Sequence, residues 1–391
     1  MNHGLKTNIL YVGNKINGIA ENPDCPPIYP ATAYCVKDTA DYDFANCGGK
    51  YFYNRTANPN RDALAQAINY LENGESTIIC SSGMAAISTT LLGLLKSGDH
   101  AVMSSAVYGE TIELIENVMK DFDVEVTFVD FTDEAAVEKA IKKNTVLLYT
   151  EIISNPLTLV VDIDKITTIA KKHNILTVVD STFTTPMVIR PLDHGADIVI
   201  HSLTKYFGGH SDITGGSITS TNDIIKRLTP KFLLFGSCLD PNSSWLLARS
   251  VRTMEMRVKA QNYNAVKIAE FLSLCPKVHA VHHPSVPTHP QHDLALKYFP
   301  EDMCGAIVSF RVDDDIEKVN KFIGKLNIIK YLGTLGGIRT TLTHPATAFM
   351  REFSKEELEK MGLFDGLIRI SVGAEDADDL IGDLNQALEV F

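Results

Sequence analysis

The sequence has no apolar run that approaches the length of a transmembrane helix, and residues 1–7 lack the apolar core of a signal peptide. Its seven cysteines include no Cys-x-x-Cys pair and form no zinc-type cluster with histidines. It also lacks a run of lysine or arginine, and its net charge is −12. These absences predict no membrane segment, no metal site and no nucleic-acid surface, and they favour a location in the cytoplasm.

The 391 residues are 45% apolar and 21% charged, which is typical of a globular protein with two or three domains. Residues 1–60 are rich in proline, tyrosine, asparagine and glycine, and we expect an extended arm that lies on another surface. Residues 61–240 alternate strand and helix patterns, which predicts an α/β domain with a mostly parallel sheet. Residues 241–391 predict a smaller α+β domain.

Short apolar runs predict strands, and amphipathic stretches predict the helices between them. We expect one helix to begin at Gly83, a long helix from Trp245 to about Ala280, and another over 316–323. The strands are expected at 78–80, 101–103, 125–129, 146–149, 175–179, 198–200 and 307–312. Five histidines between 279 and 292 are interleaved with prolines at no fixed spacing, so a solvated interdomain loop is favoured over a metal site.

The strand at 198–200 ends in hydroxyl side chains and a lysine, with Ser202, Thr204 and Lys205 in close succession. Open α/β sheets bind their ligands at the carboxyl ends of strands. An amine that can form an imine, beside hydroxyls that can hold a phosphate, suits pyridoxal 5′-phosphate (PLP), an aldehyde and a phosphate ester. Taken alone, Lys205 would be interpreted as a surface lysine.

A second strand, at 175–179, ends at Asp180. A carboxylate at that position is the partner that a pyridinium nitrogen needs to stay protonated. The stretch from Asp180 to Lys205 holds one helix-sized connection and one strand, as adjacent parallel strands require. We therefore expect both side chains at one edge of the sheet.

Ser82, Gly83 and Met84 join a short strand to a helix, where unpaired N–H groups and the helix dipole form a seat for an anion. An ordinary serine N-cap is the alternative interpretation. Because Asp180 and Lys205 also indicate a PLP site, a phosphate-binding role is favoured. Nearby, Tyr108 offers an aromatic ring to stack on the pyridine. Asn155 offers a hydrogen bond to the phenolic oxygen of PLP.

At this point the chain resembles the Cys/Met-metabolism family of PLP-dependent enzymes, the transsulfuration group. The resemblance runs from residues 53–59, Tyr-Asn-Arg-Thr-Ala-Asn-Pro, through 202–210, Ser-Leu-Thr-Lys-Tyr-Phe-Gly-Gly-His, to 367–373, Leu-Ile-Arg-Ile-Ser-Val-Gly. The group includes methionine γ-lyase, cystathionine γ-lyase, cystathionine β-lyase, cystathionine γ-synthase and the O-acylhomoserine sulfhydrylases. It implies the type I fold of PLP-dependent transferases, with a seven-stranded sheet in the large domain.

The resemblance also implies residue roles. Lys205 holds PLP covalently and then transfers protons, Asp180 pairs with the ring nitrogen, and Tyr108 stacks on the ring. Arg369 binds the α-carboxylate of an amino-acid substrate. The phosphate is held by Gly83, Met84, Ser202 and Thr204, and by Tyr53 and Arg55 of a neighbouring subunit. The implied assembly is a homotetramer, a dimer of dimers with shared active sites.

The chain departs from the family on the substrate side. Glu110 stands where glycine or cysteine is common, Gly333 stands where cystathionine γ-enzymes place a glutamate, and Thr334 replaces a usual serine. Residues 345–350 lack the usual Thr-His ending. Glu110 is open to two interpretations, a solvated acid at a helix start and a ligand for a distal group of the substrate.

These features predict a PLP-dependent carbon–sulfur lyase that carries out γ-elimination on methionine or homocysteine and gives a 2-oxo acid, ammonia and a thiol. The alternatives are γ-replacement, as in cystathionine γ-synthase or O-acetylhomoserine sulfhydrylase, and γ- or β-cleavage of cystathionine. A relative that only binds a partner and has lost catalysis is a further alternative.

Overall fold

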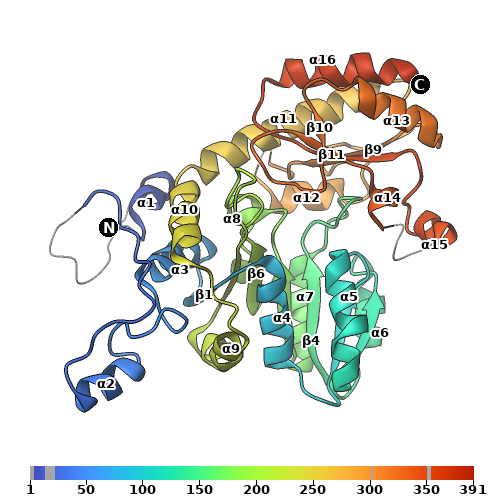
Figure 1. Ribbon diagram of the computed structural model, residues 1–391. Coiled ribbons are helices and arrows are strands. Elements are labelled where there is room, and N and C mark those ends of the chain that lie inside the picture. Colours follow the sequence, from blue (N-terminus) through green and yellow to red (C-terminus); the bar gives the residue numbers. More distant parts are fainter. Residues whose placement is uncertain (1–3, 14–22, 301–302, 350–353) are drawn as a thin grey trace.

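The computed structural model describes residues 4–13, 23–300, 303–349 and 354–391. Two sheets organise the chain, one of seven strands between residues 76 and 220 and one of five strands between 280 and 371 (Figure 1). The predicted α/β fold with a mostly parallel large sheet and a second, smaller sheet domain is confirmed. The domain limits at 60 and 240 stay predictions.

The large sheet has the strand order β1-β7-β6-β5-β4-β2-β3, and β7 alone runs against its two neighbours. Its strands are β1 Ser76–Cys80, β2 His100–Ser104, β3 Glu125–Val129, β4 Thr145–Glu151, β5 Leu176–Asp180, β6 Ile198–Ser202 and β7 Gly216–Ser220. Six of them were predicted to within two residues at each end. The pattern missed β7, because Ile218 is the only large apolar residue in its Gly-Ser-Ile-Thr-Ser sequence.

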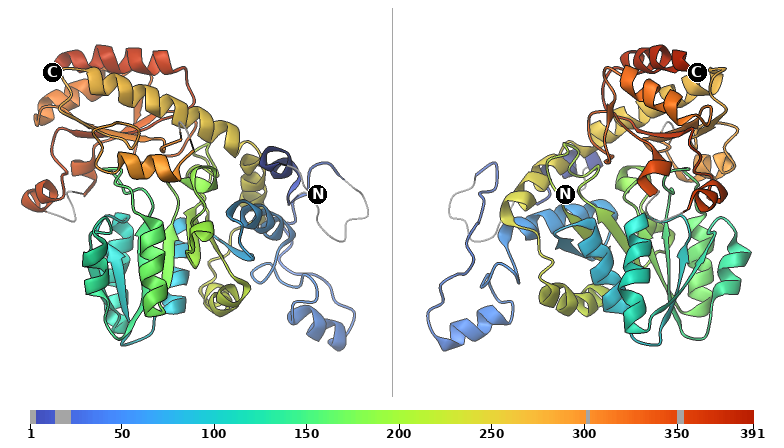
Figure 2. Two further views of the ribbon diagram at one scale, coloured as in Figure 1. Left: turned by 180° about the vertical axis from the view of Figure 1, so that it is seen from behind. Right: turned by 45° about the vertical axis from the view of Figure 1, so that its right-hand side comes forward.

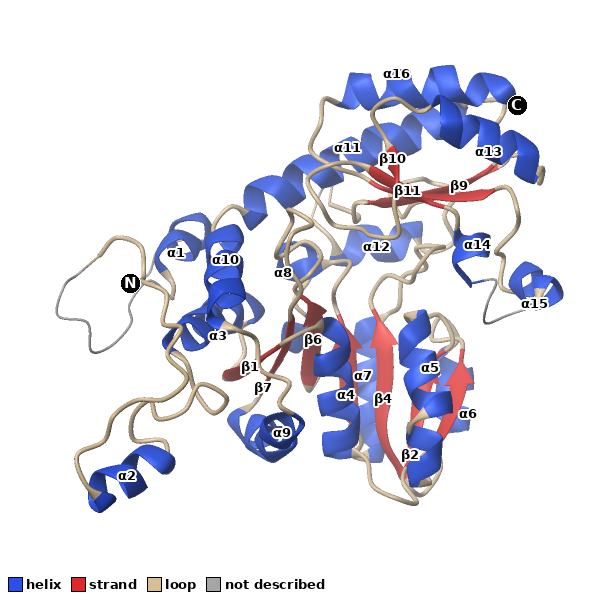
Figure 3. Ribbon diagram, viewed as in Figure 1, coloured by secondary structure: helices blue, strands red, loops and turns tan. Residues whose placement is uncertain are grey.

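Helices cover both faces of this sheet (Figure 3). The helices here are α3 Pro59–Glu72, α4 Gly83–Leu94, α5 Gly109–Asn117, α6 Glu134–Ala140, α7 Ile163–His173, α8 Thr185–Val188 and α9 Asn222–Phe235. Along β2, Ala101 and Met103 pack on the face that carries α4, α5 and α9, while Val102 packs on the face of α6 and α7. Successive strand residues thus enter two separate cores.

Parallel order brings the carboxyl ends of β4, β5 and β6 to one edge. Glu151 lies opposite Asp180 in the register of β4 and β5, and Asp180 lies opposite Ile200 of β6. The chain leaves β1 at the same edge, because β1 and β6 both run antiparallel to β7. The polar residues that follow these strands are therefore gathered at one place.

The smaller sheet has the order β10-β11-β12-β9-β8. Its strands are β8 Ala280–His282, β9 Ile307–Arg311, β10 Lys330–Tyr331, β11 Thr341–Thr343 and β12 Leu367–Ser371. The helices of this half are α13 Ile316–Lys325, α14 Pro345–Phe349, α15 Lys355–Lys360 and α16 Ala377–Ala387. Residues of α13 and α16 pack on β9 and β12 in a separate hydrophobic core.

The predicted helix over 245–280 is wrong. The segment forms two helices, α10 Pro241–Val251 and α11 Met254–Leu274, and the chain then enters β8. Asp240 caps α10 by accepting from the N–H groups of Asn242 and Ser243, which moves its start before Trp245. Pro276 prevents α11 from continuing.

The helix α11 runs from the half with the large sheet to the smaller half (Figure 1), and hydrogen bonds from one of its faces connect the two. Arg257 donates hydrogen bonds to the main-chain oxygens of Tyr206 at 2.8 Å and Phe207 at 3.2 Å, just after Lys205. One turn further on, Gln261 donates to Gly337 O at 2.8 Å. Asn264 follows at the next turn and donates to Gly373 O, beyond β12. Burial lowers the pKa of Arg257 to about 10.

The prediction of a solvated histidine-rich loop is wrong for two of its residues. His283 and His289 are buried, and burial lowers the pKa of each to about 4. The His283 ring pairs with the Ser285 hydroxyl and with Gly305 O. The segment then enters α12, His292–Tyr298. Within the described part of the chain, no group of three or more His, Cys, Asp or Glu side chains is placed to hold a metal ion.

The N-terminal arm is less extended than predicted, because it contains the helices α1 Leu5–Tyr11 and α2 Thr39–Asn46. The part that carries α2 projects away from both sheets (Figure 2). Among the described residues, no helix is long and apolar enough to cross a membrane.

The turn after Lys205 depends on Gly209, whose φ is +69°. A Cβ there would lie 1.8 Å from Nη1 of Arg257. We expect Gly209→Ala to lower the free energy of unfolding by about 3 kcal/mol or more, because left-handed strain adds to displacement of the arginine. Gly236 has the same φ with no atom of the described residues within 4 Å of its Cβ position, so Gly236→Ala should cost about 1 kcal/mol. Equal losses in urea unfolding would contradict this account.

Candidate active site

A cavity of about 370 Å³ lies between the two halves of the protein. The large sheet contributes the residues that follow its strands, among them Ser82, Asp180 and Lys205. The smaller half contributes Thr334 and Arg369. The structure thus brings together, around one space, residues that are up to 287 positions apart in the sequence (from 82 to 369).

Asp180 and Glu151 form a pair of buried carboxyl groups at the ends of neighbouring strands. Burial raises the pKa of Asp180, while hydrogen bonds from Thr182 and the nearby His201 oppose this. Burial raises the pKa of Glu151 well above its usual value, and the Asp180 charge raises it further. An ionised Asp180 therefore favours the protonated form of Glu151.

The segment after β1 forms an anion seat. Ser82 caps α4, since its Oγ accepts from the N–H of Ala85 at 3.0 Å. A Cβ on Gly83 would lie 2.8 Å from Cβ of Ser202, so glycine lets the two loops meet. The first-turn N–H groups of Gly83 and Met84 have no partner within the helix, and they suit a phosphate. Thr204 lies beside them and accepts from the N–H of Gly215 at 3.1 Å.

Lys205 follows β6 by three residues and its side chain lines the cavity. Burial lowers the pKa of its amine, and the positive charge of Arg369 lowers it further, with Glu110 opposing. A lower pKa leaves more of the amine neutral and nucleophilic, which is the form that reacts with an aldehyde.

Arg369 lies in β12 and is buried. Its Nη1 donates to Oδ1 of Asn155 at 2.9 Å and its Nη2 to Oγ1 of Thr343 at 3.0 Å. Its Nε is buried and has no hydrogen-bond partner among the described residues. A buried donor without an acceptor is costly, and a ligand carboxylate would supply the acceptor. Asn155 also lines the cavity.

Tyr108 precedes α5, and its N–H donates to Oε1 of Glu151 at 2.7 Å. Burial raises the pKa of its phenol, and a hydrogen bond with the Glu110 carboxylate raises it further. Glu110 is exposed, as expected of a solvated acid, and it also lines the cavity, as expected of a ligand for the substrate. Both interpretations of this residue therefore stay open. The sequence pattern assigned no role to Glu151, although it ends a buried strand beside Asp180.

Two predicted site residues lie elsewhere within the single chain. Arg55 donates from Nη1 to Leu233 O at 2.8 Å, and Tyr53 is 40% exposed on the arm. Neither lines the cavity. Their predicted role in a neighbouring subunit stays a prediction. Of the substrate-side segment 345–350, Pro345 and Ala348 line the cavity, and Met350 lies outside the described residues.

The features fit PLP group by group, with a buried carboxylate for the ring nitrogen, an amine for the aldehyde and helix N–H groups for the phosphate. Together with the two-sheet fold, they define a PLP-dependent enzyme of fold type I. A model of the Cys/Met metabolism PLP-dependent enzyme family matches residues 6–389, and the chain belongs to this family.

Relatives and solved structures are similar over nearly the whole chain. Cystathionine gamma-lyase of Bacillus subtilis is 42% identical over 93% of each chain. L-methionine gamma-lyase of Fusobacterium nucleatum is 36% identical over 99% of this chain and 98% of its own. A Campylobacter jejuni structure described as an O-acetylhomoserine (thiol)-lyase has a TM-score of 0.91 and 31% identity, covering 98% of this chain and 99% of its own. It contains a pyridoxyl-lysine phosphate.

Replacing Glu151 tests the carboxyl pair. Glu151→Gln keeps an oxygen that accepts from the Tyr108 N–H. Glu151→Leu leaves that N–H without an acceptor, and an unsatisfied buried donor costs about 1–3 kcal/mol of free energy. We expect the Leu variant to bind PLP at least tenfold more weakly and the Gln variant to stay within about threefold of the wild type. Equilibrium dialysis with absorbance of bound PLP measures both, and equal losses would show that the hydrogen bond is unimportant.

Proposed function

We propose that this protein is a carbon–sulfur lyase that carries out γ-elimination on methionine or homocysteine. The supporting observation is that buried Arg369, whose Nε has no hydrogen-bond partner among the described residues, lines the same cavity as Lys205. An amino acid held by its carboxylate at Arg369 would present its α-carbon to Lys205. The products would be a thiol, ammonia and a 2-oxo acid.

When bound, PLP supplies the electron sink that stabilises negative charge at the substrate α-carbon. Lys205 would hold the cofactor covalently and, once displaced by substrate, accept the α-proton at Nζ. Asp180 would keep the ring nitrogen protonated, and Tyr108 would stack on the ring. Ser82, together with Gly83, Met84, Ser202 and Thr204, would bind the phosphate. For γ-elimination a second proton must leave the β-carbon before the γ-substituent departs.

The lining of the cavity supports a thioether or thiol substrate. Its apolar members include Leu335, Pro345 and Ala348, and Gly333 has no carboxylate to offer a substrate. An apolar wall accommodates the methylthio group of methionine better than the charged distal end of cystathionine. Thr334 keeps a hydroxyl beside this wall.

We also propose that the active site is completed by a neighbouring subunit within a homotetramer. A phosphate dianion calls for a cation, and of the described residues that line the cavity only Lys205 and Arg369 are positively charged. Both have other roles here. Tyr53 and Arg55 of a second copy, carried on the projecting arm, would supply the phosphate contact. A cytoplasmic location belongs to the same proposal.

A substrate panel tests the reaction. We expect 2-oxobutyrate from methionine and homocysteine with kcat/KM at least tenfold above that for pyruvate from cystathionine or cysteine. Lys205→Ala should release neither product. Predominant pyruvate would favour β-elimination, and a new amino acid from O-acetylhomoserine plus a thiol, without 2-oxobutyrate from methionine, would favour γ-replacement.

Glu110 provides a second candidate, cleavage of cystathionine, since its carboxylate at the cavity could pair with the distal ammonium. If it does, Glu110→Gln should raise KM for cystathionine about fivefold or more, the loss of roughly 1 kcal/mol of charge pairing, with KM for methionine unchanged. Glu113→Gln on the same helix is the control. An unchanged ratio of the two KM values would leave Glu110 as a solvated acid.

A further inference from the structure

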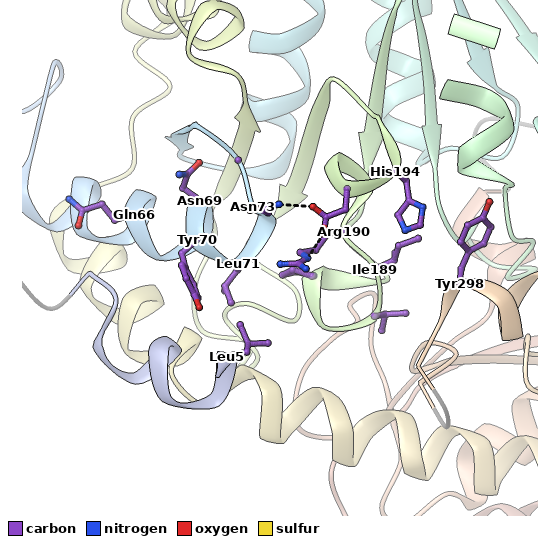
Figure 4. A pocket seen from close by; sticks show the side chains of 14 residues that line it. Leu5, Gln66, Asn69, Tyr70, Leu71, Asn73, Ile189, Arg190, His194 and Tyr298 are labelled. Carbon is purple, nitrogen blue, oxygen red and sulfur yellow. Dashed lines mark hydrogen bonds and ion pairs between the residues drawn. The ribbon is translucent and has the colours of Figure 1, made fainter. Parts of the chain in front are cut away.

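A second hollow, about 770 Å³, lies away from the candidate active site, between α3 and the segment after α8 (Figure 4). Its charged groups pair with one another or with close neighbours. Arg190 contacts Asp193 at 2.8 Å, Asn73 donates to the same carboxylate at 2.7 Å, and His194 lies 2.8 Å from Asp164. The charged side chains of this hollow are therefore already paired among the described residues.

A pair of cysteines beside the phosphate loop has a different character. Cys80 is the last residue of β1, and on the side away from β7 it forms an isolated antiparallel bridge with Cys238. The N–H of Ser81 donates to Ser237 O at 2.7 Å, so the hydrogen bond flanks the cysteine pair. In such non-hydrogen-bonded pairs the Cα atoms are about 4.5 Å apart and the side chains share a face, within the range of a disulfide.

The packing agrees with this register, because Cys238 packs against the hydrophobic cluster that contains Cys80. The two thiols have different surroundings. Cys80 is fully buried, and burial raises the pKa of its thiol. Cys238 is half-buried, and the charge of Arg61 acts on both thiols. Reactive cysteines lie in partly exposed, electropositive surroundings, and of this pair only Cys238 combines exposure with the nearby cation.

We propose that Cys80 and Cys238 form a reversible disulfide in response to peroxide and that this bond controls the phosphate loop. Peroxide would oxidise the Cys238 thiol to a sulfenic acid and release one water. The Cys80 sulfur would then attack the Cys238 sulfur, forming S–S and breaking S–O, and the departing hydroxide would take the Cys80 proton to leave as a second water. Each thiol supplies one electron, and a dithiol would reverse the reaction.

The effect on the site rests on the proposed PLP binding at Ser82 and Gly83. Cys80 is separated from Ser82 by one residue, and the segment 237–239 is also held by Arg61, whose Nη1 donates to Leu239 O at 3.2 Å. A cross-link between the two segments would fix the entry to the loop. It would also close a long chain segment, from 80 to 238, which restricts the unfolded state. We expect oxidation to raise thermal stability and slow cofactor release.

Peptide mapping tests the bond itself. The full-length protein is treated with a few equivalents of hydrogen peroxide, alkylated and digested with trypsin without reduction. We expect a cross-linked pair of peptides 62–96 and 232–249, each of which contains one cysteine. Dithiothreitol should remove it. Cys238→Ser and Cys80→Ala should prevent it, whereas Cys275→Ser, at another half-buried cysteine, should retain it. Oxidation of Cys238 to a sulfinic acid with Cys80 still reduced would overturn the proposal.

Stability and release then test the consequence. The unfolding midpoint of the oxidised protein, with or without added PLP, should rise by about 5 °C, and Cys238→Ser should show no shift. PLP release, followed by fluorescence, should slow at least threefold. An unchanged release rate with the cross-link formed would overturn control of the loop. Because the peptide map needs no bound PLP, it distinguishes this failure from a failure of the proposed function.

Discussion

The buried polar face of α11 is the constraint on which the rest of the structure depends. Arg257 holds the turn that follows Lys205, and Gln261 and Asn264 hold main-chain oxygens of the smaller half. Lys205 and Arg369 belong to different halves, and both line one cavity. Hydrogen bonds to main-chain oxygens on both sides of a single rigid helix fix their separation, which side-chain contacts across a cleft would leave loose. The same helix explains the Gly208-Gly209 sequence, since a side chain at Gly209 would meet Arg257.

The sequence allowed those parts of the site to be predicted that sit at the ends of buried strands. Apolar runs before Asp180 and Lys205 are local signals, and parallel order then places the two residues together. The break between α10 and α11 was missed because the two residues at the break are Arg252 and Thr253, and neither is a glycine or a proline that would indicate the end of a helix. The burial of His283 depends on its partner Gly305, 22 positions away, so no local pattern could indicate it. Glu151 was missed for a similar reason, because its place in the site depends on the hydrogen bond that it accepts from the N–H of Tyr108, a residue distant in the sequence.

Some residues of the cavity follow the family pattern, and others differ from it. Residues around Asp180 and Lys205 follow the family pattern, and under the proposed function they would provide the first chemical steps common to lyases and synthases of this group. Glu110 and Gly333 differ from that pattern and line the same cavity. Differences in reaction within such a family are therefore expected to arise from these positions, through pocket shape and charge, while the machinery that removes protons stays the same.

The unpaired Nε of Arg369 also bears on the stability of the folded protein. A buried donor without an acceptor, together with two cationic side chains around one cavity, favours the binding of an anion there. Because binding and folding are linked, a bound anion is expected to stabilise the folded chain. Loss of that ligand would then expose the chain to unfolding and proteolysis as well as stop catalysis.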